Sequence, residues 1–332
     1  MTREVDEQAR PQMENVFTEE ETERGPRRSA VVSRELLRLV EERDDVVVLS
    51  ADMGNAVGDL RERHPDRYFE FGIAETNTVS VAAGMASCGL IPYVVSMGPF
   101  GAIKCAEQLR ADVASTRLPV RFVARLSGLA MGFFGASHHA VEDLAIARSI
   151  TNLTVAAPSD ENAAAALLRS TVEHDGPVFF RVSEGGDAQV YADVPVIERG
   201  RFVRVRDGSD ATVIATGVGV GAALGAARLL EPEGVSLAVL DAAYLKPLDE
   251  EAILQAAEAT GAILTVEEHN VVGGLGTAVA EVLGRRRVAV DLRVHGLPDD
   301  DLDVATPAAL LERYNLTPQG VAGQVRALLA DR

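Results

Sequence analysis

The stretch Val46-Val47-Val48-Leu49-Ser50-Ala51-Asp52 decides the fold of this chain. Four consecutive apolar residues that end in small and polar ones are typical of a short strand buried on both faces, as in a parallel sheet. Similar runs recur downstream with helical patterns between them: Tyr93-Val94-Val95, Val120–Val123, Leu153–Val155 and Val178–Phe180. Strands that alternate with helices predict an α/β fold with a doubly wound parallel sheet.

A second, smaller α/β unit follows two glycines at 185 and 186. Residues 187–209 look like a linker with an edge hairpin, and alternating strands and helices resume from Ala211 to Val294. We therefore predict two doubly wound domains, over 26–188 and 189–332. Residues 1–25 are polar and acid-rich, too poor in apolar surface to fold alone, and we expect them to form a flexible acidic tail.

The composition excludes several classes of function. The formal net charge of the 332 residues is −18, which argues against a nucleic-acid-binding surface, because such a surface needs a basic patch. No run approaches the ~20 apolar residues of a membrane span, and the N-terminus lacks the apolar segment of a signal peptide. We expect a cytoplasmic protein whose two cysteines, Cys88 and Cys105, are buried free thiols.

Candidate functional residues lie in the loops that follow the strands, because open α/β sheets bind ligands at the carboxyl ends of their strands. The first is Glu75, in Phe71-Gly72-Ile73-Ala74-Glu75-Thr76-Asn77, at the start of an apolar helix. A carboxylate there is also favoured by the helix dipole, so a plain capping role is the alternative.

Two further candidates are a histidine pair and an arginine. His138 and His139 lie in the Gly-containing loop Phe133–Asp143. Adjacent histidines in a loop tend to point apart and no third ligand is obvious, so we predict no metal site in this chain. Arg181 ends a strand in Phe180-Arg181-Val182, where it could bind a phosphate or carboxylate, or form a surface ion pair.

Taken in order, these motifs resemble the transketolase family. GIAE, SMGPF, LPV, GASHHAVEDL, APSDEN and FFR follow the order of its cofactor-pyrimidine domain, and EEHNVVGGLGTAVAEVL resembles its C-terminal domain. The resemblance runs from about residue 29 to the end and implies an enzyme that uses thiamine diphosphate.

The other half of such enzymes carries a Gly-Asp-Gly motif, with a downstream Asn, that holds Mg²⁺ and the diphosphate. This sequence contains no Gly-Asp-Gly. The resemblance therefore implies the C-terminal subunit of a split transketolase. It would pair, two copies with two, with an N-terminal subunit that carries the motif and most of the Mg²⁺ site, and it would act on a sugar-phosphate-type substrate.

The resemblance also assigns roles by position. Glu75 matches the Glu that hydrogen-bonds the aminopyrimidine ring of the cofactor, and His138 matches a His near the reacting carbonyl of the donor ketose. Phe100 is expected to stack on the pyrimidine, with ordinary core packing as the alternative. The remaining expected cofactor contacts are Asp52, Met97 and Ile103, and the remaining expected substrate contacts are Phe134, His139 and Arg181.

At two places the sequence departs from the family. Phe133-Phe134 stands where the family has a Gly-Glu-Asp-Gly stretch whose Asp binds a sugar hydroxyl, and Leu126 replaces a substrate His. Losing two polar contacts should change substrate preference, so we expect a less polar or unusual acceptor with a ketose phosphate donor.

Three other functions remain open. One is the β subunit of a 2-oxoacid dehydrogenase, and another is a deoxyxylulose phosphate synthase, which normally carries both halves in one chain. The third is a non-catalytic scaffold subunit that keeps the fold and binds no cofactor.

Overall fold

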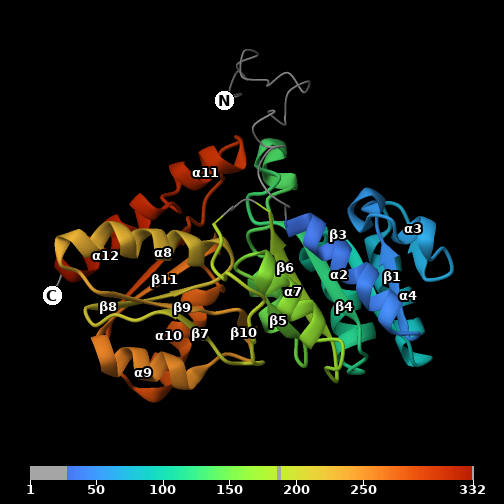
Figure 1. Cartoon of the computed structure of the whole chain (residues 1–332), viewed down its shortest axis with the longest axis horizontal. Coiled ribbons are helices and arrows are strands. Elements are labelled where there is room, and N and C mark those ends of the chain that lie inside the picture. The colour runs from blue at the N-terminus through green and yellow to red at the C-terminus, as the bar shows by residue number, and fades with distance from the viewer. Residues whose placement is uncertain (1–27, 185–187, 331–332) are drawn as a thin grey trace, which may run out of the picture.

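The computed structural model describes residues 28–184 and 188–330. The predicted tail over 1–25 and the glycines at 185 and 186 lie outside the described residues. Two α/β units lie side by side, each with a central sheet between helices (Figure 1). The predicted fold class, two doubly wound domains in series, is confirmed. No helix in the described part of the chain is long and apolar enough to cross a membrane.

The first sheet has the strand order β10-β5-β6-β4-β3-β1-β2 within the described residues, and its strands are parallel except for β10. Its strands are β1 (Val46–Ser50), β2 (Tyr68–Glu70), β3 (Ile91–Met97), β4 (Arg121–Ser127), β5 (Thr154–Ala156), β6 (Val178–Ser183) and β10 (Tyr244–Lys246). The helices around it are α2 (Arg28–Glu42), α3 (Leu60–Arg63), α4 (Glu75–Ser87), α5 (Ala106–Gln108), α6 (Asp143–Ser149) and α7 (Glu161–Ser170). Shorter or wider helical turns are η3 (Gly54–Val57), η4 (Phe100–Lys104), η5 (Leu109–Ala114) and η6 (Gly132–Ser137).

The second sheet has the order β12-β11-β8-β9-β7 and is parallel except for the pair of β7 with β9. Its strands are β7 (Val203–Arg206), β8 (Ala211–Ala215), β9 (Leu237–Asp241), β11 (Ala262–Asn270) and β12 (Asp291–Leu297). Its helices are α8 (Val218–Leu230), η7 (Glu231–Glu233), α9 (Glu250–Thr260), α10 (Leu275–Arg286), α11 (Pro307–Arg313) and α12 (Pro318–Ala330).

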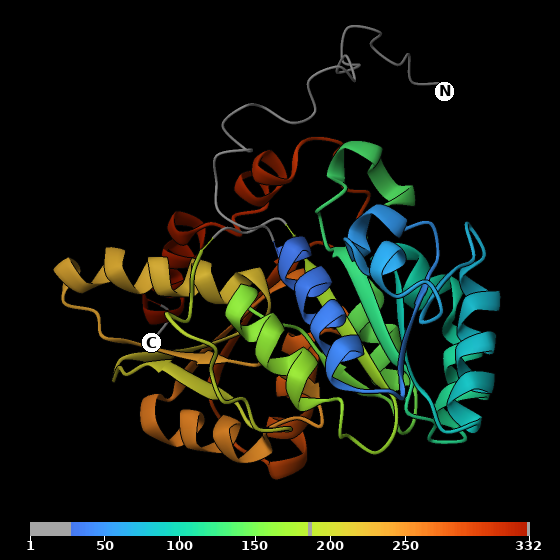
Figure 2. The same ribbon diagram turned by 45° about the vertical axis from the view of Figure 1, so that its right-hand side comes forward.

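Alternate residues of the buried strands pack into different clusters, as the continuous apolar runs require. Val47 and Leu49 of β1 pack with apolar residues of α4, whereas Val46 and Val48 pack with apolar residues of α2 and α7. Helices α2 and α7 lie side by side on their face of the sheet in both views (Figure 2). The run that predicted the fold is thus an interior strand, between β3 and the edge strand β2, and is buried on both faces.

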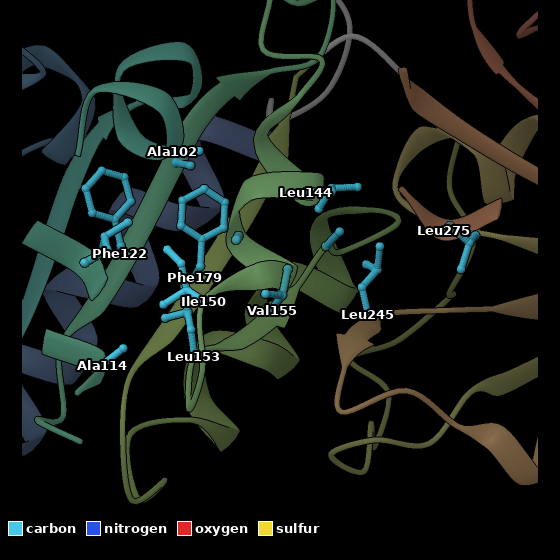
Figure 3. Close-up of a cluster of buried hydrophobic side chains, with 14 of the residues drawn as sticks. Ala102, Ala114, Phe122, Leu144, Ile150, Leu153, Val155, Phe179, Leu245 and Leu275 are labelled. Atoms are coloured by element: carbon cyan, nitrogen blue, oxygen red, sulfur yellow. The ribbon is translucent and has the colours of Figure 1, made fainter. Parts of the chain in front are cut away.

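One hydrophobic cluster joins the two units. Phe122 and Phe179 of the first sheet stack with ring centroids 5.6 Å apart. The same cluster contains Leu245 and Leu275, which come from beyond the linker (Figure 3). Strand β10 also extends the first sheet although it follows β9 of the second. This shared core holds the two units against each other.

Two details differ from the sequence-based expectations. Within 188–209 the structure forms a single strand, β7, and no hairpin, because Asp160 at the start of α7 accepts hydrogen bonds from the amides of Val190 and Tyr191 and holds that segment as a strap. Cys105 is buried as expected, but Cys88 is exposed, since it follows the last turn of α4.

Candidate cofactor and substrate site

The predicted site residues follow four strands that are neighbours in the first sheet. Strands β4, β3, β1 and β2 are adjacent and parallel, so the loops after them meet at one edge. Asp52 follows β1, Glu75 follows β2, Phe100 follows β3 and His138 follows β4. Topology thus brings together residues as far apart in sequence as 52 and 138.

Glu70 holds two of these loops together. Its Oε1 accepts hydrogen bonds from the backbone N–H groups of Asp52, at 3.0 Å, and Gly72, at 2.8 Å, and the Tyr68 hydroxyl donates to its Oε2 at 2.6 Å. Burial opposes the charge, but these donors lower the pKa of Glu70 below its usual value. Asp52 itself is exposed and adopts a φ of 55°. The sequence prediction missed Glu70, whose only signal was an acid at the end of a short strand.

Glu75 is a nearly dry carboxylate at the start of α4. Its side chain is 2% exposed. Its Oε2 lies 2.6 Å from Nζ of Lys104, and Ala74, the cap residue, makes no side-chain capping bond. Glu75 is thus paired with a cation from η4. Lys104 lay outside the sequence prediction because 29 residues separate it from Glu75.

Three rings, those of Phe100, Phe134 and His138, lie together in the loops after β3 and β4. The His138 ring lies edge-on to Phe100, with centroids 5.4 Å apart, and stacks on Phe134 at 4.6 Å. Ser137 Oγ lies 2.9 Å from Nδ1 of His138 and steadies the imidazole. Phe134 is 47% exposed, and Ile103 is 52% exposed. The rings therefore form an open apolar surface, called the shelf below. Met97, the last residue of β3, is half-buried.

His139 and Arg181 are both buried, unlike Phe134 and Ile103. His139 is 5% exposed, and its Nε2 lies 3.4 Å from the carbonyl oxygen of Gly132 in its own loop. Arg181 is 2% exposed and donates from Nε to both oxygens of Asp143 at 3.0 Å. Interpreting Arg181 as an exposed phosphate ligand does not fit this position, because nearby carboxylates and carbonyl groups already bind its guanidinium.

The second unit frames the loop that carries His138. The side chain of Glu268 in β11 accepts a hydrogen bond from the backbone N–H of Leu129 at 3.0 Å, and the backbone N–H of Asn270 donates to the carbonyl of Val141 at 2.9 Å. Gly128 has a φ of 70°, and a Cβ there would lie 2.2 Å from Oε2 of Glu268. Turn η6 also lies beside α11 in both views (Figures 1 and 2).

The donor set suits one part of the expected cofactor. A buried carboxylate next to an aromatic face matches the polar edge and flat face of an aminopyrimidine. Among the described residues there is no group of three or more His, Cys, Asp or Glu side chains placed to hold a metal ion. Two shallow hollows of about 200 and 280 Å³ lie elsewhere and contain none of the predicted site residues. The described site residues thus lie on a face where Phe134 and Ile103 are open to solvent.

Residues 26–186 match the family model of the transketolase pyrimidine-binding domain, and residues 200–321 match that of the transketolase C-terminal domain. The chain belongs to the transketolase family. A 1-deoxy-D-xylulose-5-phosphate synthase of Heliobacterium modesticaldum is 38% identical over 92% of this chain and 48% of its own length. The chain thus spans about half the length of such curated relatives.

Other relatives of this transketolase-family chain are matched along nearly their whole length. A 6-deoxy-6-sulfo-D-fructose transketolase subunit of a Clostridium species is 34% identical over 86% of this chain and 89% of its own. A solved split-gene transketolase, described as an inactive β4 tetramer, is 36% identical with a TM-score of 0.85, covering 92% of this chain and 99% of that one. The relatives therefore include both undivided synthases and separate subunits.

Proposed function

We propose that this chain is the C-terminal subunit of a thiamine-diphosphate-dependent transketolase that transfers a two-carbon ketol unit from a ketose phosphate to an aldehyde-type acceptor. The observation that carries the proposal is the buried Glu75 carboxylate, which lies on the same open sheet edge as Phe100 and His138. Bound thiamine diphosphate would supply the carbanion chemistry that joins and releases the two-carbon unit.

Each residue has a distinct task in this proposal. Glu75 shares a proton with a ring nitrogen of the aminopyrimidine and so sets its protonation state, an interaction that a dry site strengthens. Phe100 supplies the flat face for the ring, and Asp52, Met97 and Ile103 bound the same slot. His138, steadied by Ser137 and Phe134, binds the carbonyl oxygen of the donor, where negative charge develops.

The acceptor is expected to be less hydroxylated than an ordinary aldose phosphate. Phe134 is stacked on His138 and still 47% exposed, so an acceptor that approaches the imidazole meets a ring face. Leu126, with a φ of 53°, stands where the family places a substrate His. A relative named for a 6-deoxy-6-sulfo sugar supports variation of the substrate within this group of subunits.

A partner subunit is part of the proposal. It would carry Gly-Asp-Gly and hold Mg²⁺ and the diphosphate, in an assembly of two copies of each subunit. The exposed apolar side chains of Ile73 and Ile103 are suited to burial against such a partner. The related split-gene transketolase that is described as an inactive β4 tetramer supports this dependence.

The test is co-expression with a candidate N-terminal subunit, followed by calorimetry with thiamine diphosphate and Mg²⁺, with the single chain as the control. We expect tight binding by the mixture and weak binding by the single chain. Tight binding by this chain alone would mean that its own residues hold the diphosphate. Failure of the mixture to bind, with a partner that forms a complex, would favour a scaffold subunit.

A synthase reaction is the second candidate, because several relatives at 35–38% identity are 1-deoxy-D-xylulose-5-phosphate synthases. A 1-deoxy product carries a methyl ketone, so the transferred unit is acetyl and its donor is a 2-oxoacid that loses carbon dioxide. A β subunit of a 2-oxoacid dehydrogenase would start from the same donor class. Parallel assays of the complex with ketose phosphates and with 2-oxoacids separate these reactions.

A further inference from the structure

Lys104 contacts two of the residues that the proposed function assigns to cofactor binding. Its Nζ is 2.6 Å from Oε2 of Glu75 and 5.7 Å from the centre of the Phe100 ring. These are the two groups that the proposed function assigns to the aminopyrimidine, one to its ring nitrogen and one to its flat face. The ammonium group therefore engages both at once in the chain without cofactor.

We propose that Lys104 is an internal stand-in for the aminopyrimidine, which pairs with Glu75 in the cofactor-free chain and leaves the carboxylate when the ring binds. The inference rests on the proposed function. A carboxylate with 2% exposure pays a large desolvation cost unless a charge or donor compensates it. Lys104 supplies that compensation, and the Phe100 ring adds a cation–π attraction.

The side chain of Lys104 is suited to leaving. It is 46% exposed, whereas Glu75 is 3% exposed on the same measure, so water can take up the ammonium group but cannot reach the acid easily. A lysine is a compact charge on a flexible four-carbon stem, whereas an arginine would hold a carboxylate by two parallel hydrogen bonds. Only two of the 32 basic residues of this chain are lysines, Lys104 and Lys246, and one of them stands here.

The consequence is that cofactor affinity contains the cost of separating Lys104 from Glu75. Lys104 is thus a positioning residue, since it keeps the carboxylate in place until the ring arrives. Lys104→Met retains the apolar stem and removes the charge, so the cofactor should bind more tightly. Lys104→Arg retains the charge, so it should bind as in the wild type or more weakly.

The first experiment is calorimetry of thiamine diphosphate with Mg²⁺ on the complex reconstituted with the partner subunit. We expect K104M to lower the dissociation constant on the order of tenfold, because a half-exposed ion pair no longer has to be broken. Arg38→Met removes a charge of the same sign from an exposed pair on α2 and should change the constant less than about twofold. An unchanged or weaker constant for K104M would overturn the inference. No binding by the wild-type complex would overturn the proposed function together with it.

A second measurement uses the wild-type chain, so it depends neither on enzyme activity nor on the folding of a variant. This chain is labelled with ¹³Cε-lysine and assembled with an unlabelled partner, which leaves two lysine side chains to observe. The Lys246 ammonium donates to the carbonyls of Arg148 and Ile150, away from the site, and serves as the internal reference. We expect the Lys104 signal to move when thiamine diphosphate binds. A Lys104 signal that stays fixed while calorimetry shows binding would mean that Lys104 keeps its contact with Glu75.

Discussion

Two clusters of acids and cations in this molecule differ in how exposed the cation is. At the open sheet edge, Glu75 pairs with Lys104, and between the two sheets Arg181 pairs with Asp143 and Glu268. All three acids are nearly inaccessible, at 1–3% side-chain exposure. The cations are not alike, because Lys104 is 46% exposed and Arg181 only 1%.

We infer that the exposure of the cation, and not that of the acid, distinguishes a ligand-binding site from an ion pair that only stabilises the fold. Arg181 donates to both oxygens of Asp143 and to the carbonyls of Ala140 and Glu268, so it has no path to another partner. Lys104 can turn into water and leave Glu75 free for a ligand. We therefore expect changes at Arg181 to alter stability and changes at Glu75 to alter activity.

The largest expected effect follows from Arg181→Met. Removing the guanidinium leaves Asp143 and Glu268 buried without their counter-ion, and breaking a buried pair on one side costs about 3–5 kcal/mol. Denaturant unfolding of the single chain should show this loss. The control is Arg326→Met, since the pair of Arg326 with Glu233 is exposed and its removal should cost less than about 1 kcal/mol. Similar losses in the two variants would contradict the distinction between the clusters.

Glu75→Gln should have the opposite signature. It removes the proton-sharing carboxylate, so kcat of the assembled enzyme should fall roughly a hundredfold or more, the usual contribution of a positioned acid or base. The unfolding free energy of the single chain should change little, because Lys104 can be solvated by water. Glu62→Gln, an exposed acid on α3, is the matched control and should leave both quantities unchanged. A strong loss of stability with normal kcat would make Glu75 a structural residue.

Glu267, a buried acid next to Glu268 in β11, should make the stability of the chain depend on pH. Burial raises the pKa of Glu267 to about 7, although the amides of Leu275 and Gly276 act to lower it. A raised folded-state pKa means that the stability it contributes is present at acidic pH and is lost as pH rises from about 4.5 through 7. Relative to wild type, Glu267→Gln should therefore gain up to about 3 kcal/mol in unfolding free energy between pH 5 and pH 7.5. A pH-independent difference between the two chains would show that Glu267 does not titrate in this range.

His269, two residues after Glu267, should change stability with pH in the opposite direction. Burial lowers the pKa of His269 to about 4, although Asp143 acts to raise it. The folded chain, with its neutral buried imidazole, loses stability as pH falls from about 6.5 toward 4, because the unfolded chain takes up the proton first. His269→Gln should therefore remove part of the acid sensitivity that Glu267→Gln leaves in place. Parallel pH series of the unfolding free energy of both variants distinguish the two groups.

The sequence predicted the fold well because local patterns encode it. The apolar run Val46–Leu49 needs burial on both faces, and an interior parallel strand provides it. Strand β10 could not be predicted, because three residues, Tyr244–Lys246, pair with β5 of the other unit and carry no local signal of that partner. Tertiary packing, and not propensity, decides such a strand.

The sequence indicated which loops carry the candidate residues, but it did not indicate the partners of their charged side chains. The pattern of strands and loops indicated Glu75 and His138, and the resemblance to the family indicated Phe100. Whether a charge is free depends on partners distant in sequence. Arg181 faces acids 38 and 87 residues away, and Lys104 reaches Glu75 across 29 residues, so no local motif distinguished the sealed cation from the open one.

The smallest expected effect concerns the shelf beside His138, and it extends the comparison from charge to specificity. Phe134→Asp restores an acid where the family binds a sugar hydroxyl, and at 47% exposure the new carboxylate stays hydrated and should not unfold the chain. With one ketose phosphate donor, kcat/KM should rise for a hydroxylated aldose phosphate acceptor and fall for a less hydroxylated aldehyde, each by about tenfold. Val196→Asp places the same group at an 88% exposed position and should shift neither value. Wild-type preference for the hydroxylated acceptor, or a parallel loss for both acceptors in the Phe134 variant, would mean that the ring positions His138 and does not select the acceptor.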